Sequence, residues 1–221
     1  MTAQTGTSIG GTEKPIRLLS RPRQYSVISS LHEAVCGPTG FASPQAPPSL
    51  TSAPQASTTP RMHIRPFAPA DLPALHAINV AGEPGVGAVS AQRLGETIGM
   101  GTCLVAETDG QIAGFLLLLP PETEYDSKNY QWFDERYEDY VYVDRIAIAA
   151  SARGKGVGTA LYEAGFEQFS GEALLIGCEV NTEPPNPRSL KFHAALGFAE
   201  VGRESYAPDY AVAFLARRLG T

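Results

Sequence analysis

A run of glycines and basic residues in the middle of the chain has the pattern of an anion-binding turn. The run Arg153-Gly-Lys-Gly156-Val-Gly158 follows a β-rich stretch and precedes a helical stripe of apolar residues. Alternate glycines permit a sharp bend that exposes successive backbone N–H groups, and the helix that follows adds the positive end of its dipole. Arg153 and Lys155 add formal positive charge. These residues predict a site for a phosphate-bearing ligand.

The spacing of the glycines narrows the class of ligand. The turn does not fit G-x-x-x-x-G-K-[ST], which excludes a nucleoside triphosphatase loop. It also misses the G-x-G-x-x-G pattern of dinucleotide folds, because Gly154 and Gly156 are followed by Gly158 and not by a glycine at 159. Glycines alone are equally typical of an ordinary strand-to-helix turn, so that alternative stays open at this point.

A second informative segment lies between Glu179 and Phe198. Asn186 has the side chain of an N-cap, Pro187 suits the first helical position, and Gly197 suits the position after the last turn. These signals predict a helix from Pro187 to Leu196.

Together the two segments resemble the GNAT superfamily of N-acetyltransferases. Its pyrophosphate signature, Gln/Arg-x-x-Gly-x-Gly/Ala, is matched by Arg153, Gly156 and Gly158. Its Phe-Tyr-x-x-x-Gly-Phe segment is matched by Phe192, Gly197 and Phe198, but His193 stands where the family has Tyr.

The resemblance implies an acetyl-CoA-dependent enzyme in which an amine attacks the thioester directly in a ternary complex. Backbone amides of residues 153–158 would hold the pyrophosphate, and the strand at Ile146, Ala147 and Ile148 would pair with the pantetheine arm. Backbone N–H groups near Ala147 and Ile148 would hold the oxyanion. The residues that we expect to contact the coenzyme are Ile146, Ala147, Ile148, Arg153, Gly154, Lys155, Gly156, Val157, Gly158, Thr159, Asn181, Asn186, Arg188 and Phe192.

The departure at His193 leaves two interpretations open. In the family the Tyr often protonates the departing thiolate, and histidine can also donate a proton near neutral pH. Alternatively, His193 packs beside the coenzyme and only hydrogen-bonds, while water protonates the thiolate.

Transfer to an amine also requires a base, because a typical amine is protonated at pH 7. Asp144, on the strand that enters the glycine turn, is our first candidate, and Glu179 is the second. An ion pair between Asp144 and a neighbouring arginine is an equally good interpretation of that carboxylate. Arg145 follows it directly, but successive strand residues face opposite sides, so we expect the partner of Asp144 to lie elsewhere.

Helix and strand signals alternate from Met62 onward and predict a mixed α/β sheet with helices on both faces. Asp71 is the expected N-cap of a helix over Leu72–Val80. Asp109-Gly110 predicts a hairpin. The expected strands are 63–67, 102–107, 111–119, 140–149, 173–180, 199–205 and 210–216, and the other helices are near 90–98, 157–169 and 187–196.

Residues 1–61 differ from the rest. They are rich in Ser, Thr, Pro and Ala, and we expect a disordered leader that precedes an acetyltransferase domain over residues 62–221. Its basic, serine-bearing stretch Lys14–Val35 overlaps the composition of a transit peptide. The alternative that we favour is that Met62 is the true start.

Net charge and cysteine content indicate which classes of partner and site to expect. Residues 62–221 carry twelve Lys and Arg against twenty-one Asp and Glu, a net of about −9, which argues against nucleic acid and suits a cationic acceptor. Three scattered cysteines give neither a metal-ligand spacing nor a disulfide framework, so we expect no metal and a cytoplasmic location. The longest uncharged apolar run is strand-sized, so we expect no membrane span.

The connector over residues 122–139 carries seven carboxylates and several aromatics. It is interpreted either as a wall that attracts a cationic acceptor or as a solvated loop. A non-catalytic acyl-CoA-binding sensor remains the alternative to an enzyme, and the resemblance is compatible with a homodimer.

Overall fold

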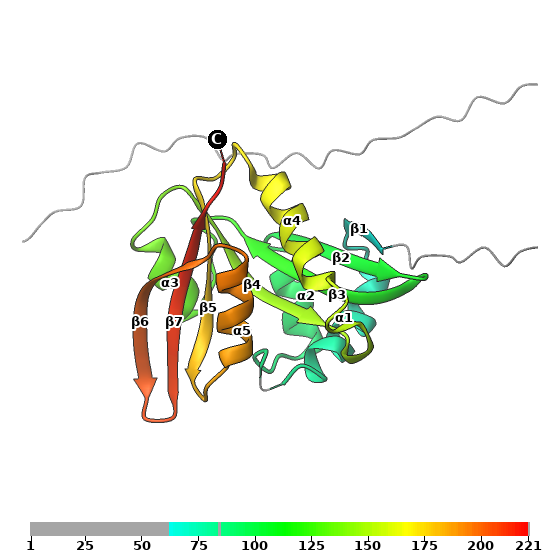
Figure 1. The fold of residues 1–221 in the computed structure, drawn as a ribbon, viewed down its shortest axis with the longest axis horizontal. Helices are drawn as coiled ribbons and strands as arrows, with labels where there is room; N and C mark the ends of the chain where they lie inside the picture. The colour runs from blue at the N-terminus through cyan, green and yellow to red at the C-terminus, as the bar shows by residue number, and fades with distance from the viewer. Residues whose placement is uncertain (1–61, 84, 221) are drawn as a thin grey trace, which may run out of the picture. The chain divides into compact units, whose positions relative to one another are not determined.

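Seven strands form one mixed sheet in the computed structural model, which describes residues 62–83 and 85–220 (Figure 1). The predicted leader lies outside the described residues. The elements, in chain order, are β1 Met62–Pro66, η1 Pro69–Asp71, α1 Leu72–Val80, α2 Ala91–Ile98, β2 Thr102–Thr108, β3 Gln111–Leu119, α3 Lys128–Asp134, β4 Tyr140–Ile148, η2 Ala150–Ala152, α4 Val157–Phe169, β5 Leu175–Glu183, α5 Pro187–Ala195, β6 Ala199–Ala207 and β7 Tyr210–Arg218.

Alternate residues of the central strands face different helices. Leu104 and Leu116 pack in the core that contains α4, whereas Val105 and Phe115 pack in the core of α1 and α2. Side chains of a strand point to opposite faces in turn, so a strand covered on both sides is apolar throughout. The predicted mixed sheet with helices on both faces is confirmed.

Strand β4 occupies the centre of the sheet order β1-β2-β3-β4-β5-β7-β6. It pairs antiparallel with β3 and parallel with β5. Within these two described strands, β4 and β5 pair only from Tyr140 to Tyr142 and from Leu175 to Gly177, and beyond those residues they separate (Figure 1). The separation leaves the C-terminal parts of both strands free to line a site between them.

Local signals placed most element boundaries correctly. The helix over Leu72–Val80 and the strand over Gln111–Leu119 have the predicted bounds. Both residues of the Asp109-Gly110 hairpin have positive φ, as that tight turn requires. Asn186 caps α5 by accepting a hydrogen bond from the Ser189 N–H at 3.1 Å.

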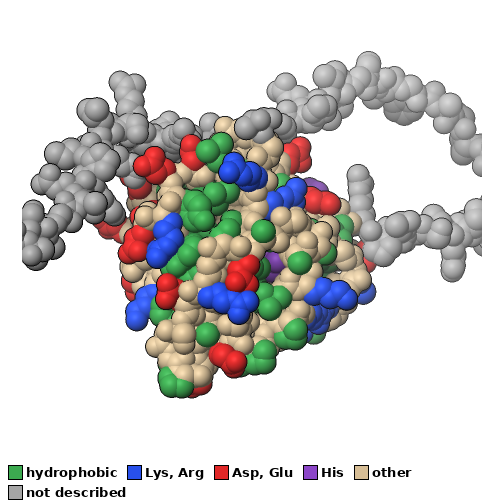
Figure 2. Space-filling model, turned by 60° about the vertical axis from the view of Figure 1, so that its left-hand side comes forward, with side chains coloured by type: hydrophobic (Ala, Val, Ile, Leu, Met, Phe, Trp, Pro, Cys, Tyr) green, Lys and Arg blue, Asp and Glu red, His purple; other side chains and the backbone are tan. Residues whose placement is uncertain are grey.

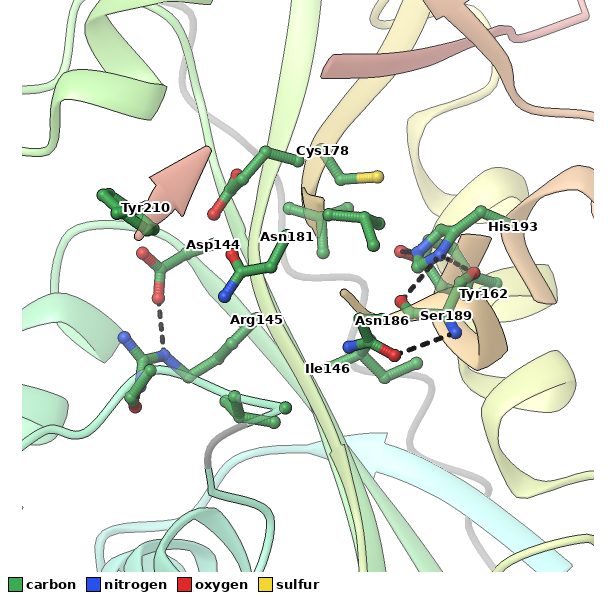
Figure 3. Close-up of a pocket in the computed structure, with 16 residues that line it drawn as sticks. Asp144, Arg145, Ile146, Tyr162, Cys178, Asn181, Asn186, Ser189, His193 and Tyr210 are labelled. Carbon is green, nitrogen blue, oxygen red and sulfur yellow. Dashed lines mark hydrogen bonds and ion pairs between the residues drawn. The ribbon is translucent and has the colours of Figure 1, made fainter. Parts of the chain in front are cut away.

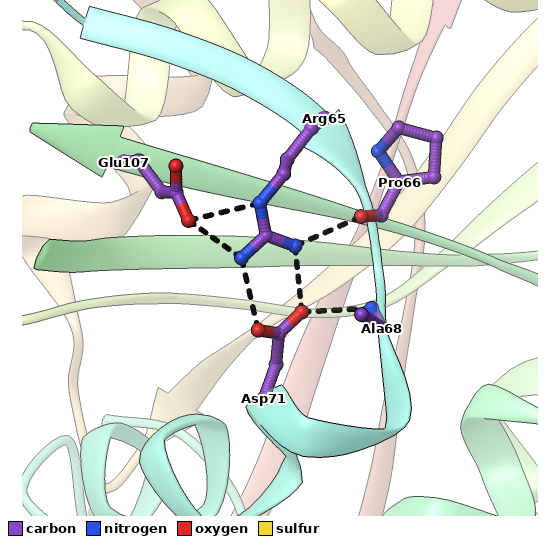
Figure 4. Close-up of polar contacts among 5 residues, drawn as sticks. All are labelled: Arg65, Pro66, Ala68, Asp71 and Glu107. Carbon is purple, nitrogen blue, oxygen red and sulfur yellow. Dashed lines mark hydrogen bonds and ion pairs between the residues drawn. The ribbon is translucent and has the colours of Figure 1, made fainter. Parts of the chain in front are cut away.

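Asp71 occupies the predicted N-cap position of α1, but its side chain does not cap the helix. Its carboxylate instead accepts a hydrogen bond from the Ala68 N–H at 2.7 Å and forms an ion pair with Arg65 (Figure 4). Arg65 also binds Glu107, so one guanidinium joins β1, η1 and β2. A side chain committed to this non-local partner is no longer available to the helix terminus.

The connector over residues 122–139 contains a helix, α3, that the sequence analysis did not predict. Its Tyr130, Trp132 and Phe133 are buried in a third core together with β4 and β7. Trp132 stacks on Phe214 with ring centroids 4.0 Å apart. These three aromatics therefore stabilise the fold and do not form a wall for an acceptor.

Candidate active site

Two adjoining cavities lie where β4 and β5 separate. The first, which we name the glycine-turn cavity, has a volume of about 420 Å³ and runs from β4 to the turn before α4. The second, the carboxylate cavity, has a volume of about 190 Å³ and is lined by Asp144 on β4 and Glu179 on β5. Figure 3 shows this cavity with Asp144 labelled. Ile146 and Asn186 line both cavities, together with Gly85, Val86 and Ser189.

The glycine turn is exposed and has the conformation that an anion site needs. Gly154 and Gly156 have φ of +76° and +81°, in the left-handed region that favours glycine, and no atom lies within 4 Å of a Cβ built on either residue. Gly156 is the N-cap of the thirteen-residue α4. A third glycine, Gly158, lets the Phe192 ring pack closely on α4, because a Cβ there would lie 3.0 Å from that ring.

The structure brings nearly all of the predicted coenzyme contacts to the glycine-turn cavity. The exceptions are Lys155, which is exposed and lines neither cavity, and Asn181, which lines the carboxylate cavity instead. Arg153 lines the cavity, and its guanidinium also donates to the backbone oxygens of Ile148 and Ala81, at 3.2 and 3.4 Å. The same arginine therefore holds the turn against α1.

The expected separation of Asp144 from Arg145 was wrong. Arg145 Nε lies 2.6 Å from Asp144 Oδ2, and both side chains are nearly buried. The reason is a β-bulge: Leu117 pairs with Arg145 and Leu118 pairs with Val143, so Asp144 has no partner in the ladder. A bulge breaks the alternation of faces and lets neighbouring side chains point the same way.

Asp144 is therefore committed to fixed partners. Besides Arg145, it accepts a hydrogen bond from the Tyr125 hydroxyl at 2.6 Å. Arg145 in turn donates to the Asn79 side chain at 3.0 Å and to the Gly87 backbone oxygen at 3.4 Å. These contacts tie β4 to the loop that borders both cavities.

Glu179 is in a different electrostatic position. Its carboxylate accepts a hydrogen bond from the Tyr142 hydroxyl at 2.5 Å, and within the described residues no cation forms an ion pair with it. Burial, together with the negative charge of Asp144, raises the pKa of Glu179 to about 7. A carboxylate with that pKa can take a proton from an amine and release it again at neutral pH.

His193 lies at the inner wall of the carboxylate cavity and is only 3% exposed. Its Nδ1 lies 2.8 Å from the Ser189 backbone oxygen, and its Nε2 lies 2.7 Å from the Tyr162 hydroxyl. Burial lowers the pKa of His193. The histidine is thus a packed, hydrogen-bonded residue, and its part in catalysis stays a prediction.

Several residues of the carboxylate cavity were not singled out by sequence reasoning. Tyr162, Ser189 and Tyr210 line it, as does the loop that contains Gly85, Val86 and Gly87. Tyr162 follows Gly158 by four residues, one helical turn, so its spacing from the glycine turn was a usable signal. Cys103 and Cys178 are buried free thiols.

Comparison with known proteins identifies the family. Residues 73–198 match the model described as the acetyltransferase (GNAT) family. The chain belongs to this family. It is a GNAT acyltransferase, and the sheet, the glycine turn and α5 are the family's fold as described above.

Related proteins are similar over different extents. This GNAT chain is 31% identical over 97 residues to the L-2,4-diaminobutyric acid acetyltransferase of Nocardia farcinica, a match that covers 43% of this chain and 42% of that protein. The ribosomal-protein-S18-alanine N-acetyltransferase of Escherichia coli is similar in structure, with a TM-score of 0.57 and 18% identity over 73% of this chain and 96% of that one. The ribosomal-protein-alanine N-acetyltransferase of Brucella melitensis gives a TM-score of 0.54 and 24% identity over 71% and 99%. The two structures show the shared fold.

The surface, the helices and the distribution of possible metal ligands add three findings. Among the described residues of the face in Figure 2, acidic and basic side chains are interspersed and form no basic stripe. No described helix combines the length and apolar character that a membrane crossing requires. Within residues 62–83 and 85–220, no group of three or more His, Cys, Asp and Glu is arranged to hold a metal ion.

Proposed function

We propose that this GNAT enzyme transfers the acetyl group of acetyl-CoA to a small primary amine, with Glu179 as the general base. The observation that carries the proposal is the position of a carboxylate with a pKa of about 7 in a cavity that adjoins the glycine turn. The coenzyme supplies the activated acetyl thioester when it is bound. Everything else in the reaction depends on side chains and amides of this chain.

The glycine-turn cavity fits the coenzyme. Gly154 and Gly156 are exposed and lie at the N-terminus of α4, so their backbone N–H groups can serve as donors for the pyrophosphate. Arg188 also lines this cavity and can pair with a phosphate oxygen. The apolar side chains of Ile146 and Phe192 line this cavity, and Ile146 also lines the carboxylate cavity, which suits a chain of methylene and amide groups.

Glu179 is a better candidate for the base than Asp144. Asp144 accepts one close hydrogen bond from the Tyr125 hydroxyl and one from Arg145, with which it also forms an ion pair, so both of its oxygens already have fixed partners. Glu179 accepts a hydrogen bond from the neutral hydroxyl of Tyr142, and its pKa is one at which both protonation states are populated at neutral pH. Its carboxylate would take a proton from the acceptor amine, directly or through one water, before the amine attacks.

The acceptor site favours a small cationic amine. The cavity holds the carboxylates of Glu179 and Asp144 and the polar side chains of Asn181 and Tyr210. Since one charge of this set is balanced by Arg145, a single ammonium group matches the remainder. The Nocardia relative acts on a diamino acid by its name, so 2,4-diaminobutyrate belongs among the first acceptors to try.

The test is release of coenzyme A thiol by the full chain from acetyl-CoA, over a panel of diamines, diamino acids, aminoglycosides and short peptides. We expect turnover with small cationic amines and a half-maximal pH near 7. The alternative, a sensor that binds the coenzyme without turnover, predicts calorimetric binding of acetyl-CoA and no thiol release with any amine. Absence of binding to acetyl-CoA would remove both.

A further inference from the structure

A row of hydrogen bonds crosses from α4 to α5 at the inner wall of the carboxylate cavity. The Tyr162 hydroxyl lies 2.7 Å from His193 Nε2, and His193 Nδ1 lies 2.8 Å from the Ser189 backbone oxygen (Figure 3). Both rings are buried, and both line the cavity that holds Glu179. The rings meet edge to face with centroids 5.4 Å apart, so their relative position is fixed by packing as well.

The partners of His193 determine where its proton lies. A backbone carbonyl can only accept, so Nδ1 must carry the hydrogen that is shared with Ser189. Burial favours the neutral imidazole, which carries only one N–H. Nε2 is therefore an acceptor, and the hydrogen between the two rings belongs to Tyr162. His193 has no proton to give on the side that faces Tyr162.

We propose that Tyr162 is the catalytic residue that donates a proton to the departing thiol, and that His193 is a positioning residue that holds the Tyr162 hydroxyl. This inference rests on the proposed function. His193 lacks the hydroxyl of the family's tyrosine at this position. The Tyr162 hydroxyl, on α4, lies 2.7 Å from His193 Nε2 and takes its place. His193 Nε2 accepts a hydrogen bond from that hydroxyl, and the bond from His193 Nδ1 to the Ser189 backbone oxygen holds the imidazole in one orientation.

The proton balance closes with groups of this chain and the acceptor. Glu179 takes the first proton of the ammonium group and later releases it to solvent. As the new C–N bond forms, the C–S bond breaks and its electron pair stays on sulfur. Tyr162 turns its hydroxyl hydrogen away from His193 Nε2 and gives that proton to the sulfur. The phenolate then takes up the second proton that the nitrogen releases, through water in the cavity. The net change is one proton released for each acetyl group transferred.

Burial is compatible with this role. It raises the pKa of Tyr162, so the phenol stays protonated at neutral pH. Burial also raises the pKa of a thiol that leaves into the same cavity, which favours transfer of the proton to its sulfur.

The experiment compares two buried tyrosines in the full chain. Tyr162→Phe removes only the proposed donor, and Tyr140→Phe, whose hydroxyl contacts Asp134 at 3.0 Å, is the matched control. We expect Tyr162→Phe to lower kcat about 100-fold or more, to leave the Kd of coenzyme A within about twofold by calorimetry, and to shift the Nε2 resonance of His193 in the nitrogen-15 spectrum. The control should change none of the three.

A rescue pair separates proton donation from packing. Tyr162→Phe with His193→Tyr moves the hydroxyl across the pair and should recover most of the rate, whereas Tyr162→Phe with His193→Phe should not. If wild type turns over normally and Tyr162→Phe stays within twofold of it, this inference is overturned and the proposed function stands. The inference is also overturned if the Kd for coenzyme A rises along with the loss of kcat and the hydroxyl swap recovers nothing. No turnover by wild type with any amine overturns the proposed function, and this inference with it.

Discussion

Two clusters of partly or fully buried carboxylates in this protein face opposite electrostatic surroundings. In the first, Asp71 and Glu107 share the guanidinium of Arg65, with atoms 2.6 to 2.9 Å apart (Figure 4). In the second, Glu179 lies close enough to Asp144 for the like charge to be felt and binds only neutral groups itself. The first arrangement lowers the pKa of Asp71, and the second raises the pKa of Glu179.

This difference in pKa indicates which carboxylate can exchange a proton at neutral pH. A carboxylate held by arginine stays ionised and fixes the geometry of the strands around it. A carboxylate that is desolvated without a cation changes its protonation state near neutral pH, and it costs stability to keep it charged. The protein uses the first kind to attach η1 to the sheet and, we infer, the second kind to activate the acceptor.

The largest expected effect is the loss of the titrating carboxylate. Glu179→Gln keeps the size and the acceptor oxygen for Tyr142 but cannot take a proton. We expect kcat to fall by about 10² to 10⁴, with the Kd of acetyl-CoA unchanged, and the limb of the pH–rate profile near 7 to disappear. Glu107→Gln is the matched control, because it makes the same chemical change in the Arg65 cluster. Equal losses in both variants, measured by thiol release, would contradict the comparison.

The second effect concerns stability. Because the folded pKa of Asp71 is depressed, its ion pair contributes stability that is fully present above the unfolded pKa near 4 and is lost as pH falls through the folded pKa. We expect Asp71→Asn to cost about 2 kcal/mol at pH 7 and much less in acid. Urea unfolding of both proteins across pH 2 to 7 measures this. A cost that does not shrink at low pH would show that the charge is not what matters.

The third effect has the opposite slope. The folded pKa of Glu179 lies above its ordinary value of 4.5, so the native state binds more protons and stability falls as pH rises from about 4.5 to 7. Glu179→Gln removes that slope, and we expect it to be more stable than wild type at pH 8 by on the order of 2 kcal/mol. At pH 4 the two should unfold at similar urea concentrations. A variant that is less stable than wild type at pH 8 would mean that the carboxylate is compensated after all.

The smallest effect is expected from the connector. Neutralising Glu135, Glu138 and Asp139 would raise the KM of a cationic acceptor if they formed its binding wall. None of the three lines either cavity, so only screened, long-range attraction remains. We expect a change in KM of less than about twofold at physiological salt, measured with the best amine of the panel. A several-fold rise would place the acceptor outside the carboxylate cavity.

Much of the scaffold was predictable because its signals are local. The glycine turn, the cap of α5 at Asn186 and the Asp109-Gly110 hairpin each depend on a few adjacent residues, whose backbone preferences hold in most contexts. The family resemblance depends on the same local segments. The residues predicted to contact the coenzyme lie together largely because one strand, one turn and two helix starts carry them.

The arrangement of the carboxylates was not predictable in the same way. The pairing of Asp144 with Arg145 depends on a bulge that appears only when β4 is laid against β3. The buried aromatics of α3 show the same limit, since a run of charged and aromatic residues is a loop or a core helix according to what covers it.

The amino-acid sequence by itself determined where the chain turns, where its helices begin and which segment can hold a phosphate, because these properties depend on glycine, proline and capping side chains within one or two turns. Only the tertiary structure decided which carboxylate stays charged and which ring holds a proton. The contacts responsible join Tyr142 to Glu179 and Tyr162 to His193, residues 37 and 31 positions apart, and burial acts on each of them only after the sheet and its helices have assembled.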